Sequence, residues 1–133
     1  MYDKLAKIAL EMRSKAYAPY SHFTVGVALL ARSGEVYEGT NIENASFGAT
    51  ICAERVAISR AIIEGENTFE AIAIAGAKEG EEVLKPCYPC GICVQTLSEF
   101  FDADTKVILV EGDSYTVRNF SEIAPATFGK EDL

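Results

Sequence analysis

Apolar residues recur along the chain at two spacings, and each spacing predicts one kind of element. Leu5, Ile8 and Met12 recur every three or four residues, as on one face of a helix. Residues 69–77 are apolar almost throughout, as in a strand covered on both faces. The segments predicted as helices are 2–16, 51–64 and a stretch that begins at Pro89, with a brief helical turn capped by Ser121. The segments predicted as strands are 25–31, 36–39, 69–77, 106–110 and 115–118.

Helical and strand segments alternate, which predicts a layered α/β domain. Ser33 and Gly34 form a turn signal between the first two predicted strands, so we expect these strands to pair as a hairpin. A hairpin excludes a purely parallel sheet, and the number of segments predicts a mixed sheet of about five strands. No linker or internal repeat interrupts the chain, so residues 1–133 are expected to form a single domain.

Composition and charge narrow the classes of partner. Hydrophobic residues make up 49% of the chain and charged residues 24%, which is typical of a folded globular domain. The formal net charge of −8 repels polyphosphate and disfavours a nucleic-acid partner, but it leaves a small neutral substrate open. No apolar run is long enough for a membrane span, and the amphipathic opening from Met1 to Lys7 does not resemble a secretory signal. We therefore expect a cytoplasmic protein with no membrane partner.

Four cysteines occur, and three of them, Cys87, Cys90 and Cys93, are crowded into one short segment. In a chain expected to be cytoplasmic, such clustering indicates metal or redox chemistry and not a disulfide framework. Cys52 lies at the start of the second predicted helix, and Cys90 and Cys93 lie at the start of the third. Unpaired amide groups and the helix dipole favour an anion there, so these thiols are expected to have lowered pKa values and to bind a metal as thiolates.

Three thiolates leave one position of a tetrahedral zinc ion free, which is the pattern of a catalytic site. Glu54 follows Cys52 by two residues and is the candidate to move the protons of a zinc-activated water. A fourth thiolate would instead suit an iron–sulfur cluster, which would leave Glu54 without a role.

Cys87 makes the ligand pair ambiguous, because Cys87 and Cys90 form a second Cys-x-x-Cys that overlaps the first. We assign the pair to Cys90 and Cys93, since the apolar stripe begins after Cys93 and the helix is expected to start at Pro89. Cys87 is then expected to be a spare thiol that packs near the site.

Several ordered segments resemble the small cytidine deaminases. Two are the metal motifs, Cys-Ala-Glu-Arg at 52–55 and Pro-Cys-Gly-Ile-Cys at 89–93. The others are Pro-Tyr-Ser-His-Phe at 19–23, Asn-Ile-Glu-Asn-Ala-Ser at 41–46 and the C-terminal Phe-Gly-Lys-Glu-Asp-Leu at 128–133. The resemblance implies a three-layer α/β/α domain, one Zn²⁺ per subunit, and a homotetramer whose active sites are shared between subunits.

The resemblance also implies a role for each matching residue. Cys52, Cys90 and Cys93 would bind the zinc ion, and Glu54 would act as general acid and base. The implied substrate-binding residues are Phe23 against the base, Asn41 and Glu43 on the ribose hydroxyls, the backbone of Ala53 at the pyrimidine edge, and Phe128 from a neighbouring subunit. An amide with a carboxylate supplies the donors and acceptors that hydroxyls need, and an aromatic ring suits a flat base.

Three thiolates and one Zn²⁺ sum to a formal charge of −1, which weakens the metal as a Lewis acid. Arg55 follows the ligand Cys52 closely, so its guanidinium is expected to donate to the ligand sulfurs and offset this charge. Two positions depart from the family pattern: Val94 stands where an arginine is often found, and Thr24 stands where a proline is common. The first departure leaves details of the subunit contacts and of the site's electrostatics open.

The predicted reaction is the hydrolytic deamination of cytidine and deoxycytidine to uridine and deoxyuridine. Three other classes stay open on the sequence. A deaminase of RNA or DNA would need a basic surface. A non-catalytic zinc-stabilised interaction module would not need Glu54, and a deaminase of another cytosine-bearing compound would alter the loop from Asn41 to Asn44.

Overall fold

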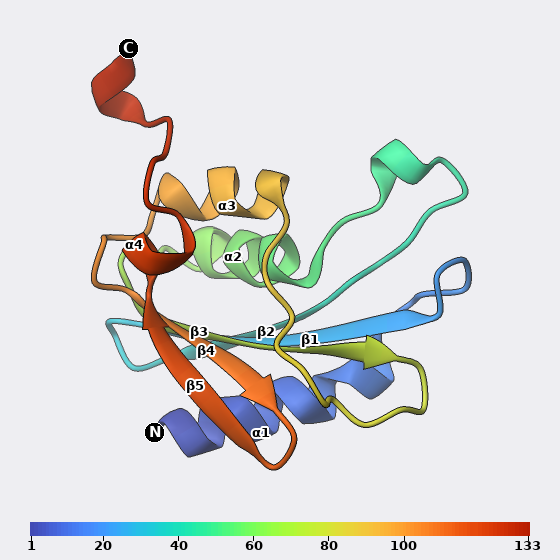
Figure 1. The fold of residues 1–133 in the computed structure, drawn as a ribbon. Helices are drawn as coiled ribbons and strands as arrows, with labels where there is room; N and C mark the ends of the chain where they lie inside the picture. Colours follow the sequence, from blue (N-terminus) through green and yellow to red (C-terminus); the bar gives the residue numbers. More distant parts are fainter.

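The computed structural model describes residues 1–133 and folds them into three layers (Figure 1). The α-helices are α1 (Tyr2–Met12), α2 (Ala53–Ile63), α3 (Gly91–Ser98) and α4 (Phe120–Ile123). The strands are β1 (Phe23–Ala31), β2 (Val36–Thr40), β3 (Phe69–Lys78), β4 (Lys106–Glu111) and β5 (Ser114–Asn119). Short 3-10 turns cover Arg13–Lys15, Phe47–Ala49 and Lys130–Asp132. No helix has both the length and the apolar composition that a membrane crossing requires.

The five strands form one mixed sheet in the order β2-β1-β3-β4-β5. Only β3 and β4 are parallel; the other neighbours are antiparallel. The predicted hairpin is present, with Leu30 of β1 opposite Val36 of β2. The expectation of a mixed sheet of about five strands in an α/β domain is therefore confirmed.

Two hydrophobic cores lie on the two faces of the sheet, which is why the strands are apolar on both sides. Helices α2 and α3 cover one face and α1 covers the other (Figure 1). Along β3, Ile72 and Ile74 point to the α2 and α3 side, while Ala71 and Ala73 point to the α1 side. The smaller alanine side chains allow α1 to lie close to the sheet.

Gly39 in β2 fixes how closely the start of α2 approaches the sheet. A Cβ on Gly39 would collide with the carbonyl oxygen of Ala53, and it would lie 2.8 Å from the amide nitrogen of Ala57. The absence of a side chain therefore lets the α2 backbone rest directly on β2. The first turn of this helix carries the residues with the chemistry described below.

Three predicted helix boundaries were wrong. The third helix does not start at Pro89; it starts at Gly91 with Cys90 as its N-cap, because the backbone of Cys90 is extended (φ −72°, ψ 172°). The last short helix begins after Asn119 as its N-cap and not after Ser121, and Oε1 of Glu122 in its first turn accepts from the Asn119 amide at 2.9 Å. The first helix also ends earlier than predicted, at Met12, and continues only as a 3-10 turn.

Candidate active site

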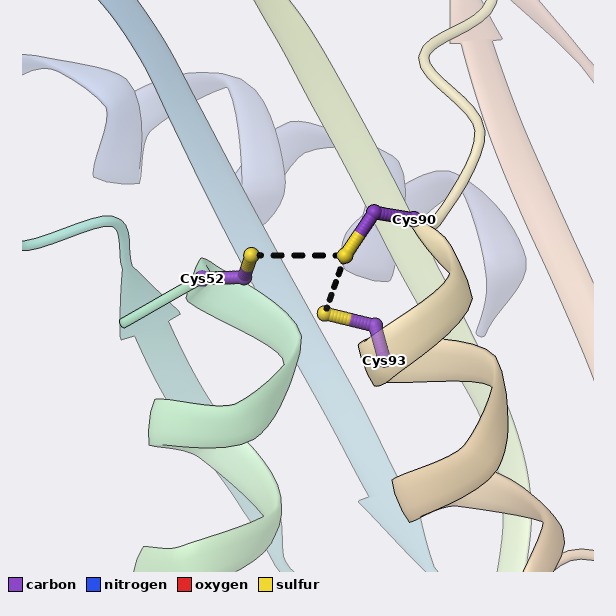
Figure 2. Close-up of side chains that lie close together, drawn as sticks. All are labelled: Cys52, Cys90 and Cys93. Carbon is purple, nitrogen blue, oxygen red and sulfur yellow. Dashed lines mark hydrogen bonds between the residues drawn. The ribbon is translucent and has the colours of Figure 1, made fainter. Parts of the chain in front are cut away.

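Three cysteines meet where α2 and α3 begin (Figure 2). Cys52 is the N-cap of α2, Cys90 is the N-cap of α3, and Cys93 lies in the first turn of α3. The Cys52 and Cys90 sulfurs are 3.7 Å apart, and the Cys90 and Cys93 sulfurs are 3.6 Å apart. All three sulfurs lie within 4.8 Å of one another and point into the gap between the helix ends.

These distances fit a single tetrahedral metal ion. Sulfurs bound at about 2.3 Å to a tetrahedral zinc ion are separated by about 3.8 Å, whereas disulfide sulfurs are separated by about 2.05 Å. All four cysteines are free thiols, so no disulfide competes for the set. Three sulfur donors are also the ligand type that zinc prefers, and three ligands leave a fourth position for a reacting molecule.

The thiols are electrostatically coupled. Contact with Cys93, together with smaller effects of Cys90 and Arg55, lowers the pKa of Cys52 to about 5 against the effect of burial. Contact with Cys52 and burial raise the pKa of Cys93, so Cys93 is the partner that keeps its proton. Cys52 is thus the thiolate of the coupled set because of its contacts with Cys93, Cys90 and Arg55, whereas the lowered pKa that the helix-start position predicted is not found at Cys93.

Glu54 is a buried carboxyl group, with only 4% of its surface exposed, in the first turn of α2. Burial raises the pKa of Glu54 to about 7, and the charge on Cys52 raises it too, while a hydrogen bond to its own backbone amide opposes the shift. A carboxyl group with a pKa near 7 both accepts and releases a proton near neutral pH. Its place beside three thiols suits proton transfer at the metal centre.

Arg55 joins the thiols to the loop before α2. Its Nη2 donates to the backbone carbonyl of Thr50 at 3.1 Å. Burial lowers the pKa of Arg55, but contacts with Cys52 and Cys93 outweigh this effect and leave the pKa raised. Its Nε is buried and has no hydrogen-bond partner, which is the orphaned donor expected beside anionic sulfur ligands.

Cys87 lies outside the cluster. Its sulfur packs on Gly76 of β3, where a Cβ would lie 2.7 Å from it and 3.1 Å from Cε1 of Phe23. Burial raises the pKa of Cys87 to about 11, and the charges of Glu54 and Cys52 add to this rise. The sulfurs that lie within 4.8 Å of one another are those of Cys52, Cys90 and Cys93, so the geometry favours Cys93 and not Cys87 as the partner of Cys90.

Asn41 and Glu43 follow β2; the start of β1 binds Asn41, and the loop before β1 binds Glu43. The Asn41 side chain accepts from the Val25 amide at 2.9 Å and donates to the Phe23 carbonyl at 2.8 Å. An amide group has two N–H donors and two acceptor positions, so Asn41 keeps one of each for a ligand. Its second role, that of fixing the position of Phe23, was not predicted from the sequence.

Glu43 accepts hydrogen bonds from the loop before β1. Its Oε1 receives the amides of Tyr20 and Ser21 at 2.9 and 3.0 Å, and its Oε2 receives the Ser21 hydroxyl. Partial desolvation raises the pKa of Glu43, but these hydrogen bonds outweigh it and leave the pKa below its ordinary value. A hollow of about 380 Å³ lies against Glu43, and its other walls are Tyr20, Ser21, Phe47 and Thr50. The partnership of Ser21 with Glu43 was missed, although both lie in segments that the sequence singled out.

The remaining predicted residues fall in two places. Ala53 is fully buried at the first position of α2, next to Cys52 and Glu54. Phe128 is 57% exposed on the C-terminal segment, which follows α4 and passes the end of α3 opposite to the end that Cys90 caps (Figure 1). The carbonyl of Phe128 accepts from Nε2 of Gln95 at 3.0 Å, so this segment rests on the outer side of α3. Phe128 therefore does not cover the site of its own chain.

Comparison with known proteins identifies the family. Residues 1–110 match the model of the cytidine and deoxycytidylate deaminase zinc-binding region. The chain belongs to the cytidine and deoxycytidylate deaminase family. A Halalkalibacterium halodurans protein named cytidine deaminase is 44% identical over 131 residues, which span 97% of this chain and 95% of that protein. A Dictyostelium discoideum protein named probable cytidine deaminase is 37% identical over 98% of this chain and 86% of its own length.

Solved structures give the same family. The crystal structure of cytidine deaminase from Burkholderia pseudomallei superposes with a TM-score of 0.86 at 37% identity, and the match covers 96% of this chain and 99% of that one. This cytidine and deoxycytidylate deaminase family is defined by its zinc-binding region, which here includes all three clustered cysteines. Zinc is therefore the metal of this centre.

Proposed function

We propose that this protein is a zinc-dependent cytidine deaminase that converts cytidine and deoxycytidine, with water, to uridine and deoxyuridine and ammonia. The observation that carries the proposal is the group of three thiols at tetrahedral spacing beside the buried carboxyl of Glu54. Relatives named cytidine deaminase that align over nearly the whole chain support the substrate. The open fourth metal position suits hydrolysis, and a non-catalytic zinc module would have no use for the buried acid.

Cys52, Cys90 and Cys93 hold the zinc ion in this proposal. When bound, zinc would lower the pKa of a water molecule and so supply a nucleophile for C4 of the pyrimidine near neutral pH. The Glu54 carboxylate takes the proton of that water and delivers it to N3 of the ring. Glu54 then carries a second proton to the 4-amino group, which leaves as ammonia, so the same side chain serves as base and as acid.

The substrate is held by residues that converge from β1, β2 and α2. Glu43 and Asn41 each keep a free hydrogen-bonding position for the ribose hydroxyls. Phe23 supplies the aromatic wall for the base, and the backbone of Ala53, at the amino end of α2, meets the pyrimidine edge. No cation lines the hollow at Glu43, so a nucleoside fits there better than a nucleotide.

The assembly is proposed to be a homotetramer in which Phe128 covers the site of a neighbour. The support is that Phe128 is exposed and rests on the far side of α3, where it leaves its own site open. Tyr20 and Phe47 also present an exposed aromatic pair beside the sugar hollow, with ring centroids 6.0 Å apart. A neighbouring subunit that covered this pair would exclude water from the site. A cytoplasmic location is proposed with it, because the thiols need a reducing compartment.

The test is an ultraviolet assay with cytidine, deoxycytidine and cytidine monophosphate, together with a zinc measurement. The nucleosides are expected to turn over with one zinc per chain, and the monophosphate is expected not to. Activity on the monophosphate alone would contradict the nucleoside assignment, and zinc binding without any deamination would favour an interaction module.

Glu54→Gln tests the proton-transfer role directly. The variant keeps the size and burial of the side chain but cannot carry a proton, so kcat is expected to fall by about 10²- to 10⁴-fold. Zinc content and melting temperature are expected to stay near those of the unsubstituted protein. Glu64→Gln, at the exposed far end of the same helix, is the matched control and should leave kcat unchanged. A Glu54→Gln protein with ordinary turnover would show that another group moves the protons.

A further inference from the structure

We propose that Ser21 is a positioning residue that holds the Glu43 carboxylate and the Phe23 wall in register, and so sets the affinity for the sugar of the nucleoside. The proposal rests on the cytidine deaminase function proposed above. It concerns a serine that is not part of the cysteine cluster.

The first step is the pair of hydrogen bonds at the Ser21 hydroxyl. The hydroxyl donates to Oε2 of Glu43 and accepts from the Phe23 amide at 3.0 Å. A hydroxyl that accepts from the amide two residues ahead forms a compact local turn. One oxygen atom therefore connects the proposed sugar carboxylate to the first residue of β1, which carries the proposed base wall.

The second step concerns the hydrogen-bond acceptor positions of the Glu43 carboxylate, most of which are already occupied. A carboxylate accepts at about four positions. The amides of Tyr20 and Ser21 and the Ser21 hydroxyl occupy three of them. One position on Oε2 is left for a sugar hydroxyl, and its direction is fixed because the other three are occupied. Without the Ser21 hydroxyl, Oε2 is free to turn away from the hollow or to bind water.

The third step is that the backbone around Ser21 is itself held in place. His22, the next residue, has a φ of +58°, which a non-glycine residue adopts only when its surroundings require it. The His22 carbonyl accepts from the Glu79 amide at 2.6 Å, and the Ser21 carbonyl accepts from Nζ of Lys78 at 3.1 Å. These contacts with the end of β3 turn the chain so that the Ser21 side chain faces Glu43.

The fourth step is the position of this group beside the metal centre. The hollow at Glu43 is bounded by Thr50, two residues before the ligand Cys52, and the Thr50 carbonyl accepts from Arg55. The wall of the hollow therefore includes the segment that leads directly into the ligand Cys52 and that Arg55 holds. Ser21 contacts none of these groups, so its effect is expected on binding and not on the chemical step.

Ser21→Ala tests the proposal. With cytidine, KM is expected to rise about 3- to 10-fold while kcat stays within about twofold, because a less well oriented Glu43 carboxylate holds the sugar more weakly in both the ground state and the transition state. Ser21→Thr keeps the hydroxyl and is expected to restore KM. Ser14→Ala is the matched control, since that exposed hydroxyl donates only to the Glu11 carbonyl. An unchanged KM in Ser21→Ala, or a fall in kcat together with a lower melting temperature, overturns the proposal.

A double-mutant cycle shows whether Ser21 acts through Glu43. Ser21→Ala should raise KM no further in a Glu43→Gln background, since the partner that it orients is already changed. Additive effects of the two substitutions overturn the proposal. The two hypotheses fail differently: a wild-type protein inactive on cytidine refutes the proposed function, whereas an active wild-type protein with a silent Ser21→Ala refutes only the role of Ser21.

Discussion

Arg55 shows at the scale of one residue how a small charge imbalance shapes the site. Three thiolates give the zinc centre a formal excess of negative charge, and Arg55 places a buried, unpartnered Nε–H beside them. Arg55→Ala is expected to lower kcat/KM or zinc affinity by about 10- to 100-fold, measured by steady-state kinetics and chelator competition. Arg60→Ala is the control on the same helix, since Arg60 is exposed and donates to the Glu38 carbonyl. Equal losses in both variants would point to a general effect of charge.

Single residues were predictable where chemistry restricts the choice of side chain. The cluster of Cys52, Cys90 and Cys93 and the nearby carboxyl of Glu54 followed from residue types and spacing, and the structure brings them together. The hydrogen bond between Ser21 and Glu43 was not predictable in the same way. It joins residues 22 positions apart in two loops, where no periodicity or motif spacing reports a contact.

At the scale of an element, Gly39 provides a test of how closely α2 packs on β2. Because a Cβ there would collide with the Ala53 carbonyl, Gly39→Ala is expected to push the first turn of α2 off β2. The free energy of unfolding should fall by about 1–3 kcal/mol in urea titrations at a fixed protein concentration, and zinc affinity should fall with it because Cys52 caps that turn. Gly48→Ala is the control, since nothing lies near its added Cβ. A stable Gly39→Ala protein with weakened zinc binding would separate the two effects and contradict the coupling between them.

The type and order of the helices and strands were predictable from the sequence, but their boundaries were predicted less well. The hairpin and the two-sided strands follow from short-range pattern, and all five predicted strands are present. The start of α3 at Gly91 was misplaced at Pro89, because proline fits a helix start as well as the residues just before it. The error matters chemically, since the correct boundary makes Cys90 an N-cap. Cys52 and Cys90 thus occupy equivalent positions on two helices, both near unpaired amide groups.

At the scale of the whole molecule, the C-terminal segment is the part that the single chain leaves without a role. Gln95 holds it by the Phe128 carbonyl, and Lys130 pairs with Glu99 at 3.4 Å, so the segment is anchored on α3 and points away from its own cysteines. If it completes a neighbour's site, activity becomes a property of two chains. Phe128→Ala is then expected to raise KM for cytidine, because the aromatic cover over the bound substrate is lost.

Mixed assemblies test this sharing directly. Glu54→Ala chains keep Phe128 but lack the proton carrier, and Phe128→Ala chains have the opposite defect. Co-expressed in equal amounts and assayed at low cytidine, the two variants should regain about a quarter of the wild-type activity if each site draws its cover from another subunit, since that fraction of sites combines both intact residues. Glu54→Ala co-expressed with a chain that carries both substitutions is the control and should gain nothing. Activity no higher than the sum of the separate variants would mean that each chain closes its own site, in which case the anchored tail must detach from Gln95 and fold back across α3.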